Sequence, residues 1–151
     1  MAATFEELQE VSMEGFQVVS GDMFRNVTRL SLPSITLWHN SISFSRATVR
    51  ALNNCERIRI EVNSNTKCIL LVPVTSKDKD AVRWVKTGKE IQPRKIECLN
   101  FATQLFSTWG WNKKNVYRAV GRIVTSDSKL MLLFDFNDPE SWQTKEKAVA
   151  K

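Results

Sequence analysis

The chain has 151 residues, of which 42% are hydrophobic and 25% are charged, as in an ordinary globular domain rather than a disordered chain. No apolar run approaches the ~20 residues of a membrane-spanning helix. The first residues are acidic where a signal peptide would be basic, so we expect a cytoplasmic protein that makes no membrane contact. Cys55, Cys68 and Cys98 are too widely spaced and too few for a disulfide framework or a zinc site.

Charge is distributed unevenly along the chain. Residues 1–24 contain five acidic residues and no Lys or Arg, so they carry −5. Because the whole chain carries +6, residues 25–151 carry +11. This pattern indicates a polyanion-binding body, with the acidic segment as a competitor for the same surface. A solubilising tail beside a basic domain fits the same numbers. We divide the chain into an acidic segment (1–24), one domain (25–138) and a charged tail (139–151).

The first predicted unit spans residues 34–74 and contains two strands, a helix and two more strands, over 35–38, 41–44, 45–52, 57–62 and 68–72. Asn40 favours a tight turn between the first two strands, because Asn tolerates the left-handed conformation. Ser45 is a good N-cap for the helix. Strict alternation of Ile and Val with charged residues over 57–62 predicts a strand with one buried face.

The second predicted unit spans residues 81–136, with strands over 81–86, 96–98, 116–124 and 130–136 and a helix after the second of these strands. Phe101, Leu105 and Trp109 form one face of its helix, which Gly110 ends. The polar segment 75–94 between the two units carries a local +3. Before the first unit, residues 5–11 have weak helical spacing and 15–24 resemble a strand. In the tail, only Trp142 is expected to dock.

The second unit repeats the layout of the first. Residues 41–52 align with 95–106 without a gap, and polar turns at 63–67 and 125–129 occupy similar places. One such unit cannot cover its own apolar face, whereas two can bury theirs against each other. We therefore predict an α+β fold of two pseudo-repeated ββαββ units, with a mostly antiparallel sheet or partly closed barrel and two main helices.

Arginines on the predicted strands and helix form the leading candidate site. A pseudo-twofold relation would present them in matched pairs, which suits a duplex, and the guanidinium fork suits phosphate. The predicted nucleic-acid-binding residues are Arg46, Arg50, Arg57, Arg59, Lys67, Arg118 and Arg122, with DNA or RNA as the partner. The alternative is a solvated strand face, because Glu61 shares a face with Arg57 and Arg59.

Two other binding modes are compatible with the sequence. Trp84 and Trp111 have basic neighbours, which single-stranded nucleic acid would require of a stacking ring; core packing is the alternative. The apolar strands 68–72 and 130–136 exceed what a two-helix sheet must cover, which suggests a homodimer or a host or phage protein partner. In the alternative reading, Phe16, Val18, Phe24 and Trp142 cover that face.

No residue pattern indicates catalysis. His39 is the only histidine and falls in a predicted turn, without a nucleophile or carboxylate nearby in sequence. The five glycines are scattered, so no phosphate-binding loop is predicted. Asp127, Asp135 and Asp138 are typical of turns and strand ends. We expect a non-enzymatic protein without cofactor or metal.

Residues 34–74 resemble the swapped-hairpin transcription factors of the AbrB and MraZ kind. The resemblance implies a strand, a short helix and a hairpin that build a basic DNA-binding barrel, and MraZ-like chains carry two such units. The stretches ITLWHNSISFS, PVTSKDKDAVRW and KLMLLFDF resemble small proteins of Gram-positive bacteria that are carried with phage or conjugative-element genes. We therefore expect a nucleic-acid-binding accessory or regulatory protein of a bacterial mobile element, with a protein-binding adaptor or inhibitor as the alternative.

Overall fold

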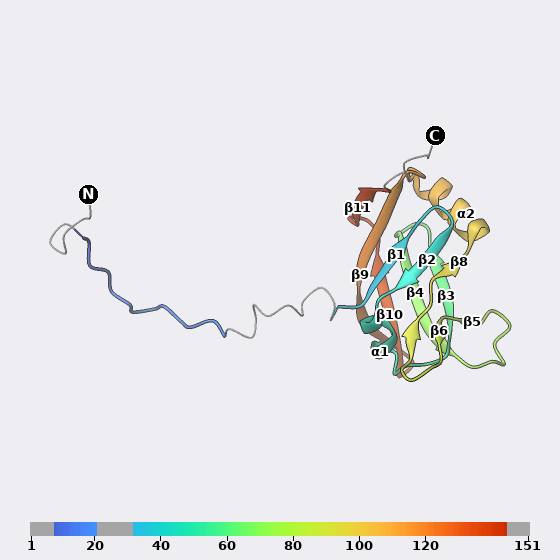
Figure 1. Cartoon of the computed structure of the whole chain (residues 1–151), viewed down its shortest axis with the longest axis horizontal. Coiled ribbons are helices and arrows are strands. Elements are labelled where there is room, and N and C mark those ends of the chain that lie inside the picture. Colours follow the sequence, from blue (N-terminus) through green and yellow to red (C-terminus); the bar gives the residue numbers. More distant parts are fainter. Residues whose placement is uncertain (1–7, 21–31, 145–151) are drawn as a thin grey trace.

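A computed structural model describes residues 8–20 and 32–144 (Figure 1). The fold is α+β, with an antiparallel sheet curled into a half-barrel and two helices, as the coarse prediction stated. The strands are β1 (Ser34–Leu37), β2 (Ser41–Phe44), β3 (Arg57–Asn63), β4 (Cys68–Val74), β5 (Val82–Arg83), β6 (Val85–Lys86), β7 (Gln92–Pro93), β8 (Ile96–Glu97), β9 (Asn115–Ser126), β10 (Lys129–Asp135) and β11 (Glu140–Gln143). The helices are α1 (Arg46–Ala51) and α2 (Leu99–Trp109).

Strand β9 connects the two halves of the sheet, whose strand order is β5-β3-β4-β10-β9-β1-β2-β8. Residues 117–120 of β9 pair with β1, residues 121–126 pair with β10, and β11 pairs with residues 115–118. Gly121 stands where β9 passes from β1 to β10. A Cβ at this position would lie 2.5 Å from the Phe134 ring, so the missing side chain allows the strand and the ring to meet.

The helix ends follow from local sequence. The Ser45 hydroxyl accepts the Thr48 N–H at the start of α1 and also accepts the Ser34 N–H over 3.0 Å, which fixes the helix to β1. Gly110 ends α2 in the left-handed conformation, with φ at 66°. Leu105 and Trp109 are buried in the core, as predicted for their helix face.

The sheet has two faces with different roles. Residues opposite each other in an antiparallel pair point to the same side. The inner face carries the core, including Ile58, Leu71, Leu132 and Phe134, which join side chains from both helices. We call the other side of β3, β4, β10 and β9 the outer face. Its residues are Arg57, Arg59, Glu61, Leu70, Val72, Met131, Leu133, Arg118, Val120, Arg122 and Val124.

Three predicted elements differ in the structure. The strand over 81–86 is divided at Trp84, whose buried indole turns inward, so β5 pairs with β3 and β6 pairs with β7. Residues 8–20 form no helix or strand, and Phe24 lies outside the described residues. Residues 140–143 of the charged tail form strand β11, because the sheet extends along β9, whereas only Trp142 of the tail was expected to dock. Neither described helix has the length and apolar character needed to cross a bilayer.

Candidate anion-binding surface

The four predicted strand arginines, Arg57, Arg59, Arg118 and Arg122, all lie on the outer face. Arg59 is opposite Val72 on β4, and Arg122 is opposite Leu133 on β10, so apolar side chains separate the two sets. The arginines of β3 and β9 therefore share a side of the sheet without forming one continuous cationic patch.

Arg59 is already engaged by carboxylates. Its guanidinium lies 2.6 Å from Asp78 Oδ2 and 3.1 Å from Glu61 Oε2. Both bonds raise the pKa of Arg59 further, so it stays charged while its donors point to its own chain. Arg57 also has a carboxylate neighbour, Glu56, at 3.7 Å. A phosphate would have to compete with these acids for both arginines.

The arginines of β9 are held by other partners. Arg118 donates to Thr36 Oγ1 over 3.1 Å and stacks on the Trp142 ring, with 4.8 Å from Cζ to the ring centroid. Hydrogen bonds from the backbone and side chain of Asn137 hold the pKa of Asp135 below its usual value, and the positive charge of Arg122 adds to this effect. The cation of Arg122 is thus partly balanced at the end of β10.

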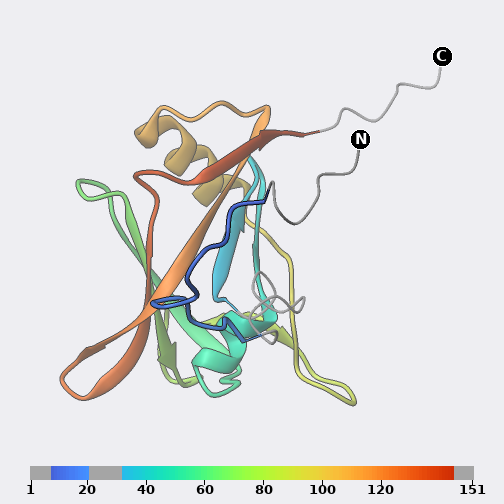
Figure 2. The same ribbon diagram turned by 90° about the vertical axis from the view of Figure 1, so that its left-hand side faces the viewer.

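Lys67 lies in the β3–β4 turn, in the left-handed conformation, where its carbonyl accepts the Phe136 N–H. Figure 2 shows this green turn at one end of the molecule and α1 at the other. Lys67 therefore does not join the two helix arginines in one site.

Arg46 and Arg50 lie one turn apart on the exposed side of α1, beside the β6–β7 hairpin (residues 85–93), which we call the arm. Figure 2 shows the arm in yellow-green, projecting from the body on the side of α1. A hollow of about 330 Å³ is lined by Arg46, Arg50, Asn54, Glu90 and Ile91. A second hollow, of about 380 Å³, is lined by Lys86, Thr87, Gly88, Lys89, Glu90 and Gln92.

The two hollows share Glu90 and together form what we call the α1–arm surface. Four cations (Arg46, Arg50, Lys86 and Lys89) line it, against the single carboxylate of Glu90. None of the four forms an ion pair with a described residue, whereas Arg57 and Arg59 both do. Cations that form no ion pair within the described part of the chain and lie next to amide and hydroxyl donors are suited to bind phosphate oxygens.

Lys86 and Lys89 were not among the binding residues predicted from the sequence. The only signal for them was the +3 charge of the segment 75–94. The charge of this segment could not show which of its cations lie beside α1, because the arm and α1 are some forty residues apart in the sequence and meet only in the folded chain. Arg46 and Arg50 were selected for their helical spacing, which the structure retains.

The aromatic residues offer little for stacking on bases. Trp84 is fully buried, and its Nε1 donates to the Cys55 carbonyl over 2.7 Å. Trp111 stacks on Tyr117, with 4.0 Å between ring centroids. Trp38 is partly buried, and Lys95 Nζ lies 4.2 Å from the centre of its ring. The core-packing interpretation therefore fits Trp84 and Trp111 better than the stacking interpretation.

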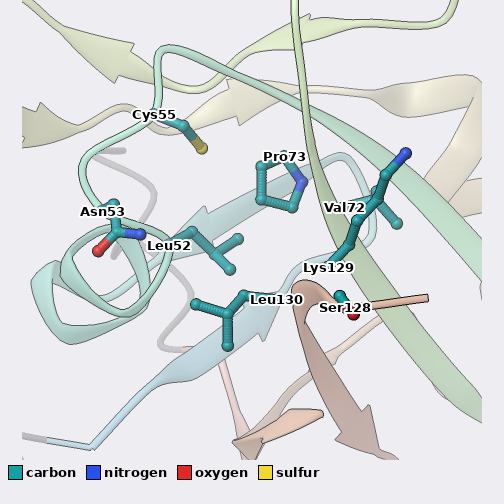
Figure 3. Close-up of a pocket in the computed structure, with 8 residues that line it drawn as sticks. All are labelled: Leu52, Asn53, Cys55, Val72, Pro73, Ser128, Lys129 and Leu130. Carbon is teal, nitrogen blue, oxygen red and sulfur yellow. The ribbon is translucent and has the colours of Figure 1, made fainter. Parts of the chain in front are cut away.

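An apolar hollow of about 420 Å³ lies at the open end of the half-barrel, between the end of α1 and the β9–β10 turn (Figure 3). Leu52, Pro73 and Leu130 face it together with Cys55, and burial raises the pKa of that thiol. Its lining includes one cation, Lys129, and no carboxylate or imidazole, so it does not assemble an acid–base pair. Within the described residues, no group of three His, Cys, Asp or Glu side chains is placed to hold a metal.

The comparisons with known proteins give no match. No family model fits the chain, and neither the curated proteins nor the solved structures include a significantly similar one. The case for a function therefore depends on the geometry of this chain.

Proposed function

We propose that this protein is a non-enzymatic nucleic-acid-binding protein that contacts the phosphate backbone through the α1–arm surface. The observation that supports this proposal is the grouping of Arg46, Arg50, Lys86 and Lys89 around two adjoining hollows, where none of them forms an ion pair with a residue in the described ranges. The described domain, residues 32–144, carries seventeen Lys and Arg against ten Asp and Glu, which favours the approach of a polyanion. The role we propose is accessory or regulatory, within a bacterial mobile element, in line with the sequence resemblance.

The outer-face arginines are a second set of cations, and they provide a matched comparison. Removing Arg46, Arg50, Lys86 and Lys89 eliminates four charges, as does removing Arg57, Arg59, Arg118 and Arg122. The two quadruple variants have the same net charge but differ in which surface has lost its cations. If long-range attraction alone drives binding, both variants should lose the same affinity. If the α1–arm surface contacts phosphate directly, the α1–arm variant should lose more.

The test is fluorescence anisotropy with a labelled duplex and a labelled single strand, titrated over a range of salt concentrations. For duplex binding by the unmodified protein, four phosphate contacts predict a slope of log K against log salt of about −3 to −4. The α1–arm variant, with all four residues changed to Gln, should lose most of this slope, and the outer-face variant should retain it. Equal losses in the two variants, or no binding to either probe at low salt, would overturn the proposal.

We further propose that the two halves of the domain are duplicated units, as the sequence layout suggests. Strands at equivalent positions pair, β2 with β8 and β4 with β10, and the pairing of β1 with β9 has a counterpart in β5 with β3. The helices differ, with six residues in α1 and eleven in α2. The turn alignment also places outer-face Arg57 over Ala119, which belongs to the core, so the duplicated hairpins would have diverged in register.

A further inference from the structure

Each of the two hollows of the α1–arm surface combines two cations with one side-chain amide. The amide belongs to Asn54 in the hollow with the two arginines and to Gln92 in the hollow with the two lysines. Both residues are exposed, and neither amide group forms a hydrogen bond with a residue that the structure describes. The side chains of Asn63 and Asn137, in contrast, are bonded to the backbone of their own chain. Both amides of the surface are therefore open to a ligand.

The arm is a two-stranded ribbon that is exposed from its second residue pair outward. Val85 is buried opposite Pro93, whereas Lys86 and Gln92, the next pair, are exposed together with the residues between them. Residues directly opposite each other in an antiparallel pair project to the same side, and these two line the same hollow. Figure 2 shows the arm projecting from the body next to α1. A narrow ribbon thus presents a cation and an amide side by side.

The width of such a ribbon selects among nucleic acids. Two antiparallel strands lie about 4.8 Å apart, and with their side chains they fit the major groove of B-form DNA, which is about 12 Å wide. The minor groove, about 6 Å wide, is too narrow for them. The major groove of A-form RNA is too narrow and deep for side chains to read its bases. An arm of this kind that enters a groove therefore requires B-form DNA.

The side chains of the surface match one kind of base pair. In the major groove, Asn or Gln forms two hydrogen bonds with adenine N6 and N7, and an apolar side chain contacts the methyl group of thymine. Ile91, which is 41% exposed, lines the same hollow as Asn54 and directly precedes Gln92 in the chain. An open amide beside an exposed aliphatic side chain fits the adenine edge and the thymine methyl group of an A·T pair.

We propose that the arm enters the major groove of B-form DNA, where Gln92 and Asn54 each read an adenine and Ile91 contacts a thymine methyl group. The four cations of the surface contact phosphates at the edges of the groove. This inference rests on the proposed phosphate-binding function. It adds to that function the class of nucleic acid and the residues that determine sequence preference.

The first test selects bound duplexes from a random-sequence DNA pool. Anisotropy then compares the selected DNA duplex with the same sequence as an RNA duplex and as a single strand. We expect A·T pairs at two positions, and a change of either to G·C should weaken binding roughly fivefold to a hundredfold. The RNA duplex and the single strand should each bind more weakly by at least the same factor, because neither offers this groove. Equal affinity for the three probes would overturn the inference alone, whereas no salt-dependent binding to any probe would reject the proposed function as well.

Neutral substitutions test the two amides. Gln92→Ala and Asn54→Gly should each abolish the preference at one of the two positions and leave the salt slope unchanged, because no charge is removed. Glycine is the replacement at position 54 because the φ of Asn54 is 56°, and Asn53, with the same φ, provides the matched control Asn53→Gly. Gln143→Ala, on β11, is the control for the other amide. Both controls should keep both preferences. Two amide variants with unchanged preferences would overturn the inference.

A modified base tests the groove itself. An adenine analogue in which carbon replaces N7 loses the major-groove acceptor and keeps its base pairing and its minor-groove edge. At the position that Gln92 reads, this analogue should weaken binding by the unmodified chain severalfold and should not further weaken binding by the Gln92→Ala variant. The same loss in both proteins, or no loss in either, would reject major-groove reading by Gln92.

Discussion

The Arg59 guanidinium donates to Asp78 Oδ2 over 2.6 Å, a bond that connects β3 to the loop nineteen residues further along the chain. The same carboxylate accepts the Asp80 N–H over 2.8 Å. These contacts engage an arginine that was predicted to bind phosphate, and they attach the 75–81 loop to the sheet at β3. They also give the clearest pH-dependent behaviour in the molecule.

The Asp78 carboxyl should titrate below its ordinary pKa of 3.8, because the Asp80 N–H and then the Arg59 guanidinium favour its ionised form. Since the folded-state pKa is lowered, the stabilisation is present above the unfolded value and is lost as pH falls through the folded one. Carboxyl NMR titration measures this pKa directly. Arg59→Gln should raise it only part of the way, because the Asp80 N–H remains, and Arg57→Gln should leave it unchanged. A titration curve unaffected by Arg59→Gln would mean that the contact is absent in solution.

Glu90 is the single carboxylate that lines the α1–arm surface, so its removal should strengthen anion binding. We expect Glu90→Gln to increase the affinity for a nucleic-acid probe at low salt by roughly two- to fivefold, the size of one exposed charge interaction. The gain should shrink as salt is added. Glu140→Gln, on β11, makes the same charge change away from the surface and serves as the control in the anisotropy assay. Equal gains in affinity for the two variants would mean that net charge alone controls binding and that the α1–arm surface has no special role.

Gly121→Ala should destabilise the fold, because the new Cβ would lie 2.5 to 2.8 Å from three atoms of the buried Phe134 ring. We expect a loss of about 1–3 kcal/mol in the free energy of unfolding, as for other overpacked cores. Urea denaturation measures it. Gly88→Ala, where the nearest atom is 4.0 Å away, should be near neutral. In a double-mutant cycle with Phe134→Leu, the double variant should lose less unfolding free energy than the sum of the losses in the two single variants.

Trp84→Phe separates the core role of this residue from a base-stacking role. It removes the buried Nε1 donor and leaves the partly buried Cys55 carbonyl without that hydrogen bond, so the free energy of unfolding should fall by about 1–3 kcal/mol. Nucleic-acid affinity should stay within error at temperatures where the variant is folded. A loss of affinity without a loss of stability would restore the stacking interpretation for this residue. Trp142→Phe, at a more exposed site, is the matched control for stability.

Local features of the fold could be predicted from the sequence because they depend on residues a few positions apart. Ser45 begins α1 through a bond to Thr48, and Gly110 ends α2 because its backbone can adopt a positive φ. Alternation over 57–62 placed Arg57 and Arg59 on the face opposite Ile58, as the structure has them. Such signals come from the geometry of a single strand or helix turn.

Which of these segments meet was decided only by tertiary structure. Trp84 has basic neighbours in sequence, yet its indole bonds to the Cys55 carbonyl twenty-nine residues earlier. The cations of the arm reach α1 through packing between segments some forty residues apart, and the arginines of β3 and β9 receive their acidic, hydroxyl and aromatic partners from other strands and loops. Periodicity specifies the face on which a side chain lies. The partner opposite it depends on how the whole chain closes around its core, and a local pattern does not carry that information.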